Sequence, residues 1–310
     1  MPPLANLAKG EDVLTLKAVI GLHFDVLSTL LLLIVFGVAA LAYSVRTVLK
    51  GRAQFDRVDK QGGSALLSKS LMEMAYWTIT PLGRALVACH ITPNQISWAS
   101  LVLGLLAGVA LGFGHFGTAA VLSTFSAFLD SLDGMVARLS GLASEAGEVL
   151  DATIDRYNEF FFLAGLTVYY RDIPALQLLA LAALAGSFMV SYSTAKAEAM
   201  NVSPPKASMR RPERALYLTL GAALSPITIP LFEQNRDFTV AIGHPMVLAL
   251  CLVALLSNVS AIERMYAVAK EMRKRENEAK RAAMIAQAAA EQSDATESRD
   301  HAHANFTIRK

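Results

Sequence analysis

Long apolar stretches alternate with short polar or basic connections along the whole chain. A helix needs about 20 apolar residues to cross the hydrocarbon core of a bilayer. Seven stretches of the sequence reach roughly this length, which predicts an all-α polytopic membrane protein. The candidate spans are residues 25–45, 96–114, 117–139, 147–170, 174–195, 213–232 and 244–266.

The basic residues of the connections favour one orientation of these spans. Lys and Arg are frequent in residues 46–92, in residues 196–214 and in the tail after Arg264. Basic loops stay on the cytoplasmic side of a membrane, so these segments are expected there and the N-terminus outside. Few positive charges occur in the alternate loops, which lie near His115, Asp172 and Asn235.

Three segments outside the spans have patterns of their own. Residues 64–90 mix apolar and polar positions, which is typical of an amphipathic helix in the membrane interface, with Trp77 at headgroup level; a soluble linker is the alternative. Residues 1–23 are charged and no small-residue cleavage site follows, so we expect a retained anchor. From Lys270 the tail predicts a charged helix, and from Gln292 its polar composition predicts disorder.

Composition agrees with a membrane protein. Of the 310 residues, 54% are apolar and 17% are charged, against about 25% charged in a soluble domain. The mean hydropathy is +0.42. A net charge of +2 gives no argument for a nucleic-acid partner. Cys89 and Cys251 fit no zinc spacing, so we expect them to be packing residues.

Four aspartates interrupt the apolar pattern in residues 130–155: Asp130, Asp133, Asp151 and Asp155. Their spacings of three and four residues place each pair on one face of a helix. A Gly/Ala/Ser-rich turn between the pairs predicts an antiparallel hairpin, with Asp133 near Asp151 and Asp130 near Asp155. Carboxylates at bilayer depth are costly, so this cluster is predicted to be a functional site, in a cavity open to the cytosol.

Carboxylates this close together need a compensating charge. Mg²⁺ or Mn²⁺ would supply it, because such ions prefer oxygen ligands and complete their shell with substrate phosphates. A network with basic residues is the alternative, although the hairpin offers only Arg138 and Arg156. Gly134, Ala137 and Gly147 leave room for a ligand or for a packed helix, and Arg138 could pair with a phosphate.

The spacing Asp-x2-Asp-Gly-x2-Ala-Arg-x8-Gly-x3-Asp-x3-Asp, from Asp130 to Asp155, resembles the complete motif of the CDP-alcohol phosphatidyltransferases. The resemblance covers residues 64–268 and implies an interfacial amphipathic helix followed by a six-helix transmembrane bundle. The first span is then one extra N-terminal transmembrane helix. We expect an N-terminal anchor with a basic linker (1–62), a transferase domain (63–268) and a cytoplasmic tail (269–310).

The resemblance also implies an activity. Members of this family transfer a phosphatidyl group from CDP-diacylglycerol to an alcohol acceptor and release CMP, with Mg²⁺ or Mn²⁺ as cofactor, two ions being expected. It further implies a homodimer in a bacterial inner membrane, with the active site facing the cytoplasm. Asp130, Asp133 and Asp151 would hold the metals, and Asp155 would complete the site and act as the catalytic base. The CDP-binding residues would be Asp130, Asp133, Gly134, Ala137, Arg138, Gly147 and Asp151.

A second cluster of basic residues suggests a phosphorylated acceptor. The proposed acceptor-binding residues are Lys196, Arg211, Arg214 and Arg264. Attraction to anionic lipid headgroups is the alternative, and it is preferred for Lys206 and Arg210. The cluster resembles the branch of the family that uses inositol phosphate. Thr194 stands where that branch has a basic residue, so glycerol 3-phosphate and unphosphorylated alcohols stay open. Glu159 could orient Asp155 or Arg156, or simply be a polar residue facing the bundle interior.

Other functions compete with this interpretation. A CDP-aminoalcohol phosphotransferase acting on diacylglycerol would use the same motif, but neutral diacylglycerol needs no phosphate clamp. A divalent-cation transporter would need polar residues that continue to the outer face, whereas Leu101–Leu111 and Leu163–Val168 are apolar. A scaffold without catalytic activity would not need the intact motif.

Overall fold

The computed structural model describes residues 5–53, 55, 68–203, 209–228 and 244–307, and within them all side chains except those of residues 5–23 and 288–307. Every regular element in this part of the chain is helical, which confirms the predicted all-α class. Residues 54 and 56–67 of the basic segment, the predicted position Lys206 and the loop near Asn235 lie outside the described residues.

Five of the described helices are long and apolar enough to cross a membrane. They coincide with five of the predicted spans, and they make the chain an integral membrane protein. These segments are Phe24–Lys50 of α1 (Ala5–Lys50), α4 (Pro93–Gly112), α5 (Phe116–Leu139), α7 (Pro174–Ala199) and Pro245–Gln287 of α11 (Pro245–Thr307).

Two further spans were predicted, residues 147–170 and 213–232. The helices found there are not both long and apolar enough to cross a membrane. Helix α6 (Glu145–Tyr169) has the length of a span, but it carries the acidic residues of the candidate site. Helix α8 (Arg211–Leu224) has 14 residues, or about 21 Å at the helical rise of about 1.5 Å per residue. The α-helix ends at Leu224, because Pro226 lacks the N–H that would continue it, and a 3₁₀ turn, Ser225–Ile227, follows. Residues 229–232 of the predicted span lie outside the described residues. The number of spans stays a prediction.

The structure forms two compact units. The first comprises residues 1–189 and 208–259, and the second comprises residues 190–207 and 260–310, so α7 and α11 contribute to both. The division into residues 1–62, 63–268 and 269–310 stays a prediction.

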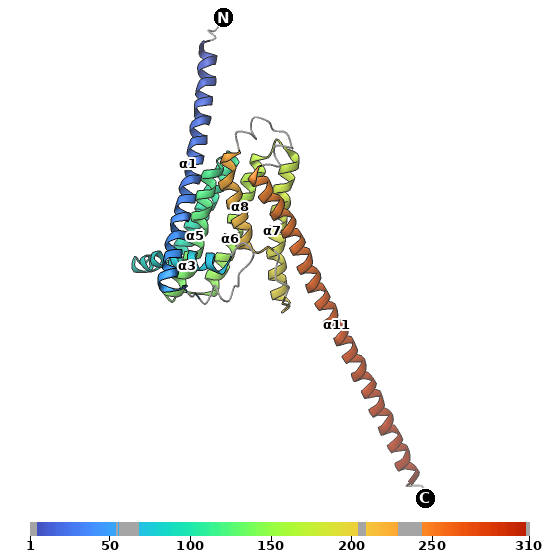
Figure 1. Ribbon diagram of the computed structural model, residues 1–310. Helices are drawn as coiled ribbons and strands as arrows, with labels where there is room; N and C mark the ends of the chain where they lie inside the picture. Colours follow the sequence, from blue (N-terminus) through green and yellow to red (C-terminus); the bar gives the residue numbers. More distant parts are fainter. Residues whose placement is uncertain (1–4, 54, 56–67, 204–208, 229–243, 308–310) are drawn as a thin grey trace. The chain divides into compact units, whose positions relative to one another are not determined.

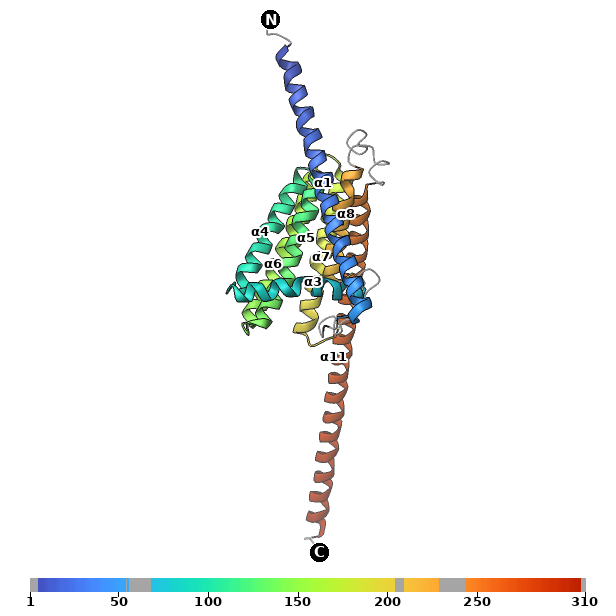
Figure 2. The ribbon, with the colours of Figure 1, turned by 60° about the vertical axis from the view of Figure 1, so that its left-hand side comes forward.

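Helix α4 packs along both α5 and α6 in the first unit (Figure 2). Gly108 and Gly165 allow the closest approach, since a Cβ at Gly108 would meet the backbone of Phe161 and one at Gly165 the backbone of Gly108. Small residues let transmembrane helices come this close. The apolar core around this contact draws residues from α4 to α8 and from the start of α11, among them Leu111, Phe116, Leu163, Leu218 and Leu250.

A capped turn joins α5 to α6. Leu142 N–H donates to Ala137 O (2.9 Å) and Gly141 N–H to Arg138 O (3.4 Å), the pair of bonds with which a left-handed residue ends a helix. Gly141 takes this conformation at a φ of 71°. Ser144 then caps α6 by accepting a hydrogen bond from Gly147 N–H. The turn therefore holds the two acidic segments at fixed positions relative to each other.

The segment predicted to be interfacial forms α3 (Lys69–Ala88), which lies crosswise to α4 and α5 (Figure 2). One face of α3 packs on α5 through Ile79, Leu132 and Met135. Helix α1 lies beside α5 (Figure 1). The buried carboxylate of Asp25 accepts hydrogen bonds from the N–H and hydroxyl groups of Thr118, in the first turn of α5.

The tail of the second unit differs from its prediction. Helix α11 continues to Thr307, so the expected change to disorder at Gln292 was wrong. Residues 282–290 are mostly Ala, Met and Gln, which are strong helix formers. Just before this segment, an ion pair between Lys280 Nζ and Glu276 Oε1, at 2.7 Å, also stabilises the helix.

Candidate active site

Three of the four predicted aspartates come together in the first unit. Asp130 lies on α5, and Asp151 and Asp155 lie one turn apart on α6. One carboxylate oxygen of each lies within 4.8 Å of the other two. The i, i+4 spacing places the α6 pair on one face, and the contacts of α4 with both helices fix the distance to Asp130.

Asp133 lies outside this group of three. Its carboxylate is buried, and Ser97 of α4 donates its hydroxyl to Oδ2 at 2.5 Å. The other oxygen accepts the backbone N–H of Gly134, at 2.5 Å. Sequence analysis missed Ser97, because a lone serine in an apolar span gives no signal of a functional contact.

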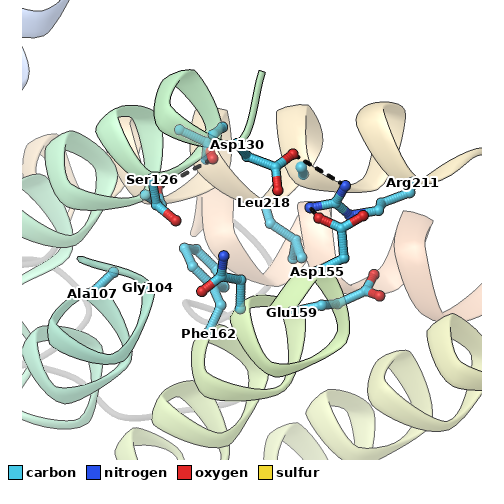
Figure 3. Close-up of a pocket in the computed structure, with 14 residues that line it drawn as sticks. Gly104, Ala107, Ser126, Asp130, Asp155, Glu159, Phe162, Arg211 and Leu218 are labelled. Atoms are coloured by element: carbon cyan, nitrogen blue, oxygen red, sulfur yellow. Dashed lines mark hydrogen bonds and ion pairs between the residues drawn. The ribbon is translucent and has the colours of Figure 1, made fainter. Parts of the chain in front are cut away.

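Arg211 of α8 stands between two of the clustered carboxylates (Figure 3). Its Nη1 lies 3.3 Å from Asp130 Oδ2, and its Nη2 is ion-paired with Asp155. This arginine was predicted to bind the acceptor. In the structure its charge compensates the aspartates, and 32% of its side chain stays exposed.

Arg214, one turn further along α8, pairs with a different acid. Its Nε and Nη2 donate to the two carboxylate oxygens of Glu159, at 2.6 and 3.1 Å. The exposed fractions of these side chains are 1% and 7%. Paired guanidinium–carboxylate bonds of this kind fix both groups. Glu159 was considered as a group that orients Asp155 or Arg156. In the structure both of its carboxylate oxygens accept hydrogen bonds from Arg214.

The predicted CDP-binding residues flank the turn between α5 and α6. Gly134 and Ala137 are half-buried positions one turn apart on α5, and Arg138 lies exposed in its last turn. Gly147 lies in the first turn of α6, where an added Cβ would come within 3.2 Å of Ser144 Oγ. All four residues therefore lie near the turn, at the end of α5 and the start of α6.

The other two predicted acceptor residues, Lys196 and Arg264, belong to the second unit. Arg264 Nη1 donates to the hydroxyl of Thr194 at 2.7 Å. Thr194, which stands where the inositol-phosphate branch has a basic residue, therefore accepts a hydrogen bond from the basic residue Arg264.

A cavity of about 80 Å³ opens beside Asp130 and Asp155, between α4, α5, α6 and α8. Gly104 and Ala107 on α4 leave room for it, and Glu159, Phe162, Arg211 and Leu218 line other sides (Figure 3). Its polar wall includes Ser123, Ser126, Asn158 and Thr219.

The acidic cluster fits a divalent cation. All of its donors are carboxylate oxygens, the ligands that Mg²⁺ and Mn²⁺ prefer. Within the described part of the chain, Asp130 Oδ1 is buried and has no hydrogen-bond donor. A buried oxygen without a donor is costly, and a bound cation would satisfy it.

Comparison with known proteins places this site in a family. The family model described as CDP-alcohol phosphatidyltransferase matches residues 90–256, more than half of the chain. This chain therefore belongs to the CDP-alcohol phosphatidyltransferases, as the motif predicted, and it is a transferase of phospholipid synthesis that uses a CDP-linked lipid and an alcohol.

The similar proteins belong to one branch of the family. Phosphatidylinositol phosphate synthase of Corynebacterium glutamicum is 35% identical over 172 residues, which cover 53% of this chain and 78% of that protein. Archaetidylinositol phosphate synthase of Pyrococcus horikoshii is 29% identical over 195 residues, covering 62% and 90%.

Two solved structures with a similar fold are of a phosphatidylinositol phosphate synthase. The crystal structure of Mycobacterium tuberculosis phosphatidylinositol phosphate synthase with CDP-DAG bound has a TM-score of 0.53 at 25% identity, over 61% of this chain and 92% of that one. The same enzyme in complex with manganese and citrate has a TM-score of 0.53 at 25% identity, over 61% and 88%.

Proposed function

We propose that this transferase moves the phosphatidyl group of CDP-diacylglycerol to a phosphorylated polyol, with inositol phosphate as the favoured acceptor. The observation that carries this proposal is the cluster of Asp130, Asp151 and Asp155, two of which pair with Arg211, beside a cavity. Acidic groups suit the metal-bound diphosphate of the donor, and a basic group suits an acceptor phosphate. The phosphatidylinositol phosphate synthases among its relatives support the choice of acceptor.

The aspartates are proposed as the ligands of the metal ions. Asp130, Asp133 and Asp151 would hold them and Asp155 would complete the site, with Mg²⁺ or Mn²⁺ as the ion and two ions expected. The manganese in a solved relative supports this assignment. Bound divalent cations would spread the negative charge that develops on the diphosphate and so favour CMP as the leaving group.

Asp155 is proposed as the general base. Its carboxylate takes the proton of the acceptor hydroxyl, whose oxygen then forms a bond to the phosphorus of the phosphatidyl group as the bond to CMP breaks. Gly134, Ala137, Arg138 and Gly147 would line the CDP pocket. Their place around the turn, next to the acidic helices, supports this role.

The acceptor phosphate would bind Arg211. In the structure this arginine compensates the aspartates, and if bound cations took over that role, its partly exposed side chain could turn to a phosphate. Arg214 would act through its pair with Glu159, as a residue that positions the α6 face next to Asp155. Lys196 and Arg264, which belong to the second unit, stay predictions of acceptor-binding residues that rest on the sequence.

The membrane arrangement is also a proposal. The basic loops support an active site that faces the cytoplasm of a bacterial inner membrane. The homodimer implied by the family would be checked by the mass of the protein in detergent.

The experiment that tests the proposed function is CMP release by the purified full-length protein. CDP-diacylglycerol and Mn²⁺ or Mg²⁺ are supplied with one acceptor at a time: inositol phosphate, glycerol 3-phosphate, inositol or serine. We expect metal-dependent CMP release with inositol phosphate and no phospholipid product with inositol or serine.

Two other outcomes would contradict parts of the proposal. Release with glycerol 3-phosphate alone would keep the phosphorylated acceptor and reject inositol phosphate, in line with the departure at Thr194. If only unphosphorylated alcohols react, or if diacylglycerol accepts from a CDP-aminoalcohol, the acceptor role of Arg211 is wrong.

A further inference from the structure

A second polar pocket lies at the end of the N-terminal helix, ahead of residue 90, where the match to the family begins. It is a hollow of about 500 Å³, open to solvent, between α1, the segment that follows it and α3. Its lining residues share a basic or aromatic character, with small residues between them. They are Arg46, Arg52, Ala53, Phe55, Trp77, Thr80, Pro81 and Arg84.

Helix α3 presents one face to this pocket and the opposite face to α5. Trp77, Thr80, Pro81 and Arg84 are spaced as neighbours on one helical face. On the other side a Cβ at Gly83 would come within 2.7 Å of Met135 Sδ, so α3 lies directly against α5. The packing of α3 on α5 therefore fixes the α3 wall of the pocket within the first unit.

The end of α1 is fixed against α3 by polar and aromatic contacts. The hydroxyl of Tyr43 donates to Glu73 Oε2 at 2.9 Å, and the Tyr43 ring lies 5.9 Å from the ring of Trp77. The guanidinium of Arg46 lies 6.0 Å from the centre of the Trp77 ring. These contacts hold a cation and an aromatic wall in place before any ligand binds.

The charged residues that line the pocket are basic among those that the structure describes. They are three arginines from three segments. Arg46 Nη1 donates to Gly51 O at 3.0 Å. Among the described side chains, Arg52 and Arg84 form no ion pair, and the nearby acid Glu73 is bound to Tyr43.

We propose that this pocket binds the phosphate diester of an anionic phospholipid headgroup. Guanidinium groups match phosphate oxygens in pairs, and aromatic residues such as Trp77 suit the headgroup level of a bilayer. The pocket lies where the first apolar span ends, at Lys50, so a lipid can reach it from the membrane. A general attraction of basic residues to anionic lipid would need no pocket.

The fluorescence of Trp77 tests the proposal in the full-length protein. The chain has two tryptophans, so Trp98→Phe, at an exposed position on α4, leaves Trp77 as the reporter. The protein is placed in phosphatidylcholine vesicles that contain a small fraction of lipid brominated near the glycerol, either phosphatidylglycerol or phosphatidylcholine. At equal fractions of brominated lipid, we expect phosphatidylglycerol to quench the Trp77 fluorescence several-fold more than phosphatidylcholine does.

Charge variants separate a pocket from a general charge effect. Arg52→Gln with Arg84→Gln should remove most of the preference for phosphatidylglycerol. Lys50→Gln, which removes an exposed charge next to the pocket, should leave the preference unchanged. Equal quenching by the two brominated lipids, or an equal loss in the Lys50→Gln protein, would overturn the proposal. We expect the preference to persist in millimolar inorganic phosphate; its complete loss would show that a free phosphate ion displaces the lipid, and would overturn the lipid as the occupant of the pocket.

Discussion

At the scale of single residues, the carboxylates of the site are held by groups from distant parts of the chain. Asp133 receives the hydroxyl of Ser97, and Asp130 and Asp155 share Arg211. These contacts compensate acidic groups that would otherwise be costly in an apolar bundle. The three clustered aspartates stay close to the cavity in which an acceptor would bind.

The role of Asp155 is tested by Asp155→Asn. The amide keeps the size of the side chain but cannot take a proton at neutral pH, so turnover should fall by about 10²–10⁴-fold, the usual contribution of a general base. Binding of CDP-diacylglycerol, measured in parallel with a labelled donor, should be largely retained. Turnover close to that of the wild type would reject Asp155 as the base.

The role of Arg211 is tested by Arg211→Gln, with Arg210→Gln as a matched control at the neighbouring position. A charge-assisted hydrogen bond contributes about 1.5–3 kcal/mol, so KM for a phosphorylated acceptor should rise by about 10–100-fold. The control should leave KM within about twofold, because Arg210 pairs with Glu213. An unchanged KM in Arg211→Gln would remove this residue from the acceptor site.

The buried pair of Arg214 with Glu159 makes a prediction about stability. Arg214→Met leaves the Glu159 charge unpaired in the bundle, which should cost about 3–5 kcal/mol. Adding Glu159→Gln removes that charge and should restore part of the loss. Thermal unfolding in detergent, followed by circular dichroism, compares the two variants. A double variant no more stable than Arg214→Met would show that the pair does not explain the effect.

Sequence spacing could predict part of the site. The i, i+4 interval grouped Asp151 with Asp155, and the predicted hairpin brought Asp130 to them, but Asp133, predicted near Asp151, lies outside the group of three. The contacts of Ser97 and Arg211 could not be predicted, because Ser97 lies 36 residues from Asp133 and Arg211 lies 81 residues from Asp130. Contacts at such separations depend on how helices pack, and a single sequence does not specify this.

At the scale of the elements, α4 explains how the acidic helices are held. We expected α5 and α6 to pack as a hairpin, yet α4 lies along both of them. After Ser100, helix α4 contains only apolar residues and glycine, so this part of its pattern gave no packing direction. The helix ends were easier to predict, since Thr92 with Pro93, Gly141 and Ser144 are strong capping signals.

The close contact of α4 with α6 is tested by Gly108→Ala, with Gly112→Ala as the control. A methyl group at Gly108 would collide with the backbone of Phe161, whereas one at Gly112 finds its nearest atom at 3.7 Å. Overpacking of this kind costs about 1–3 kcal/mol. We expect a lower unfolding temperature and lower turnover only for Gly108→Ala, because α6 carries Asp151 and Asp155. Equal effects of the two substitutions would contradict the proposed contact.

At the scale of the whole molecule, the region matched by the family is joined to segments outside it. Within the first unit, α1 contacts α5 at one end through Asp25 and Thr118 and α3 at the other through Tyr43 and Glu73. The N-terminal helix, predicted as a retained anchor, is therefore packed against the helix that carries Asp130. Sequence analysis identified this span by its length, but its polar contacts require the folded structure.

The measurement that tests the central claim most directly is CMP release from CDP-diacylglycerol with inositol phosphate, with and without divalent metal. The wild type should release CMP with Mn²⁺ or Mg²⁺ and lose this activity in excess EDTA, and re-added metal should restore it. Asp130→Asn should need a higher metal concentration for half-maximal activity, because it removes one oxygen charge from the cluster. CMP release that continues in EDTA, or an unchanged metal requirement in Asp130→Asn, would contradict a transferase built on this acidic cluster.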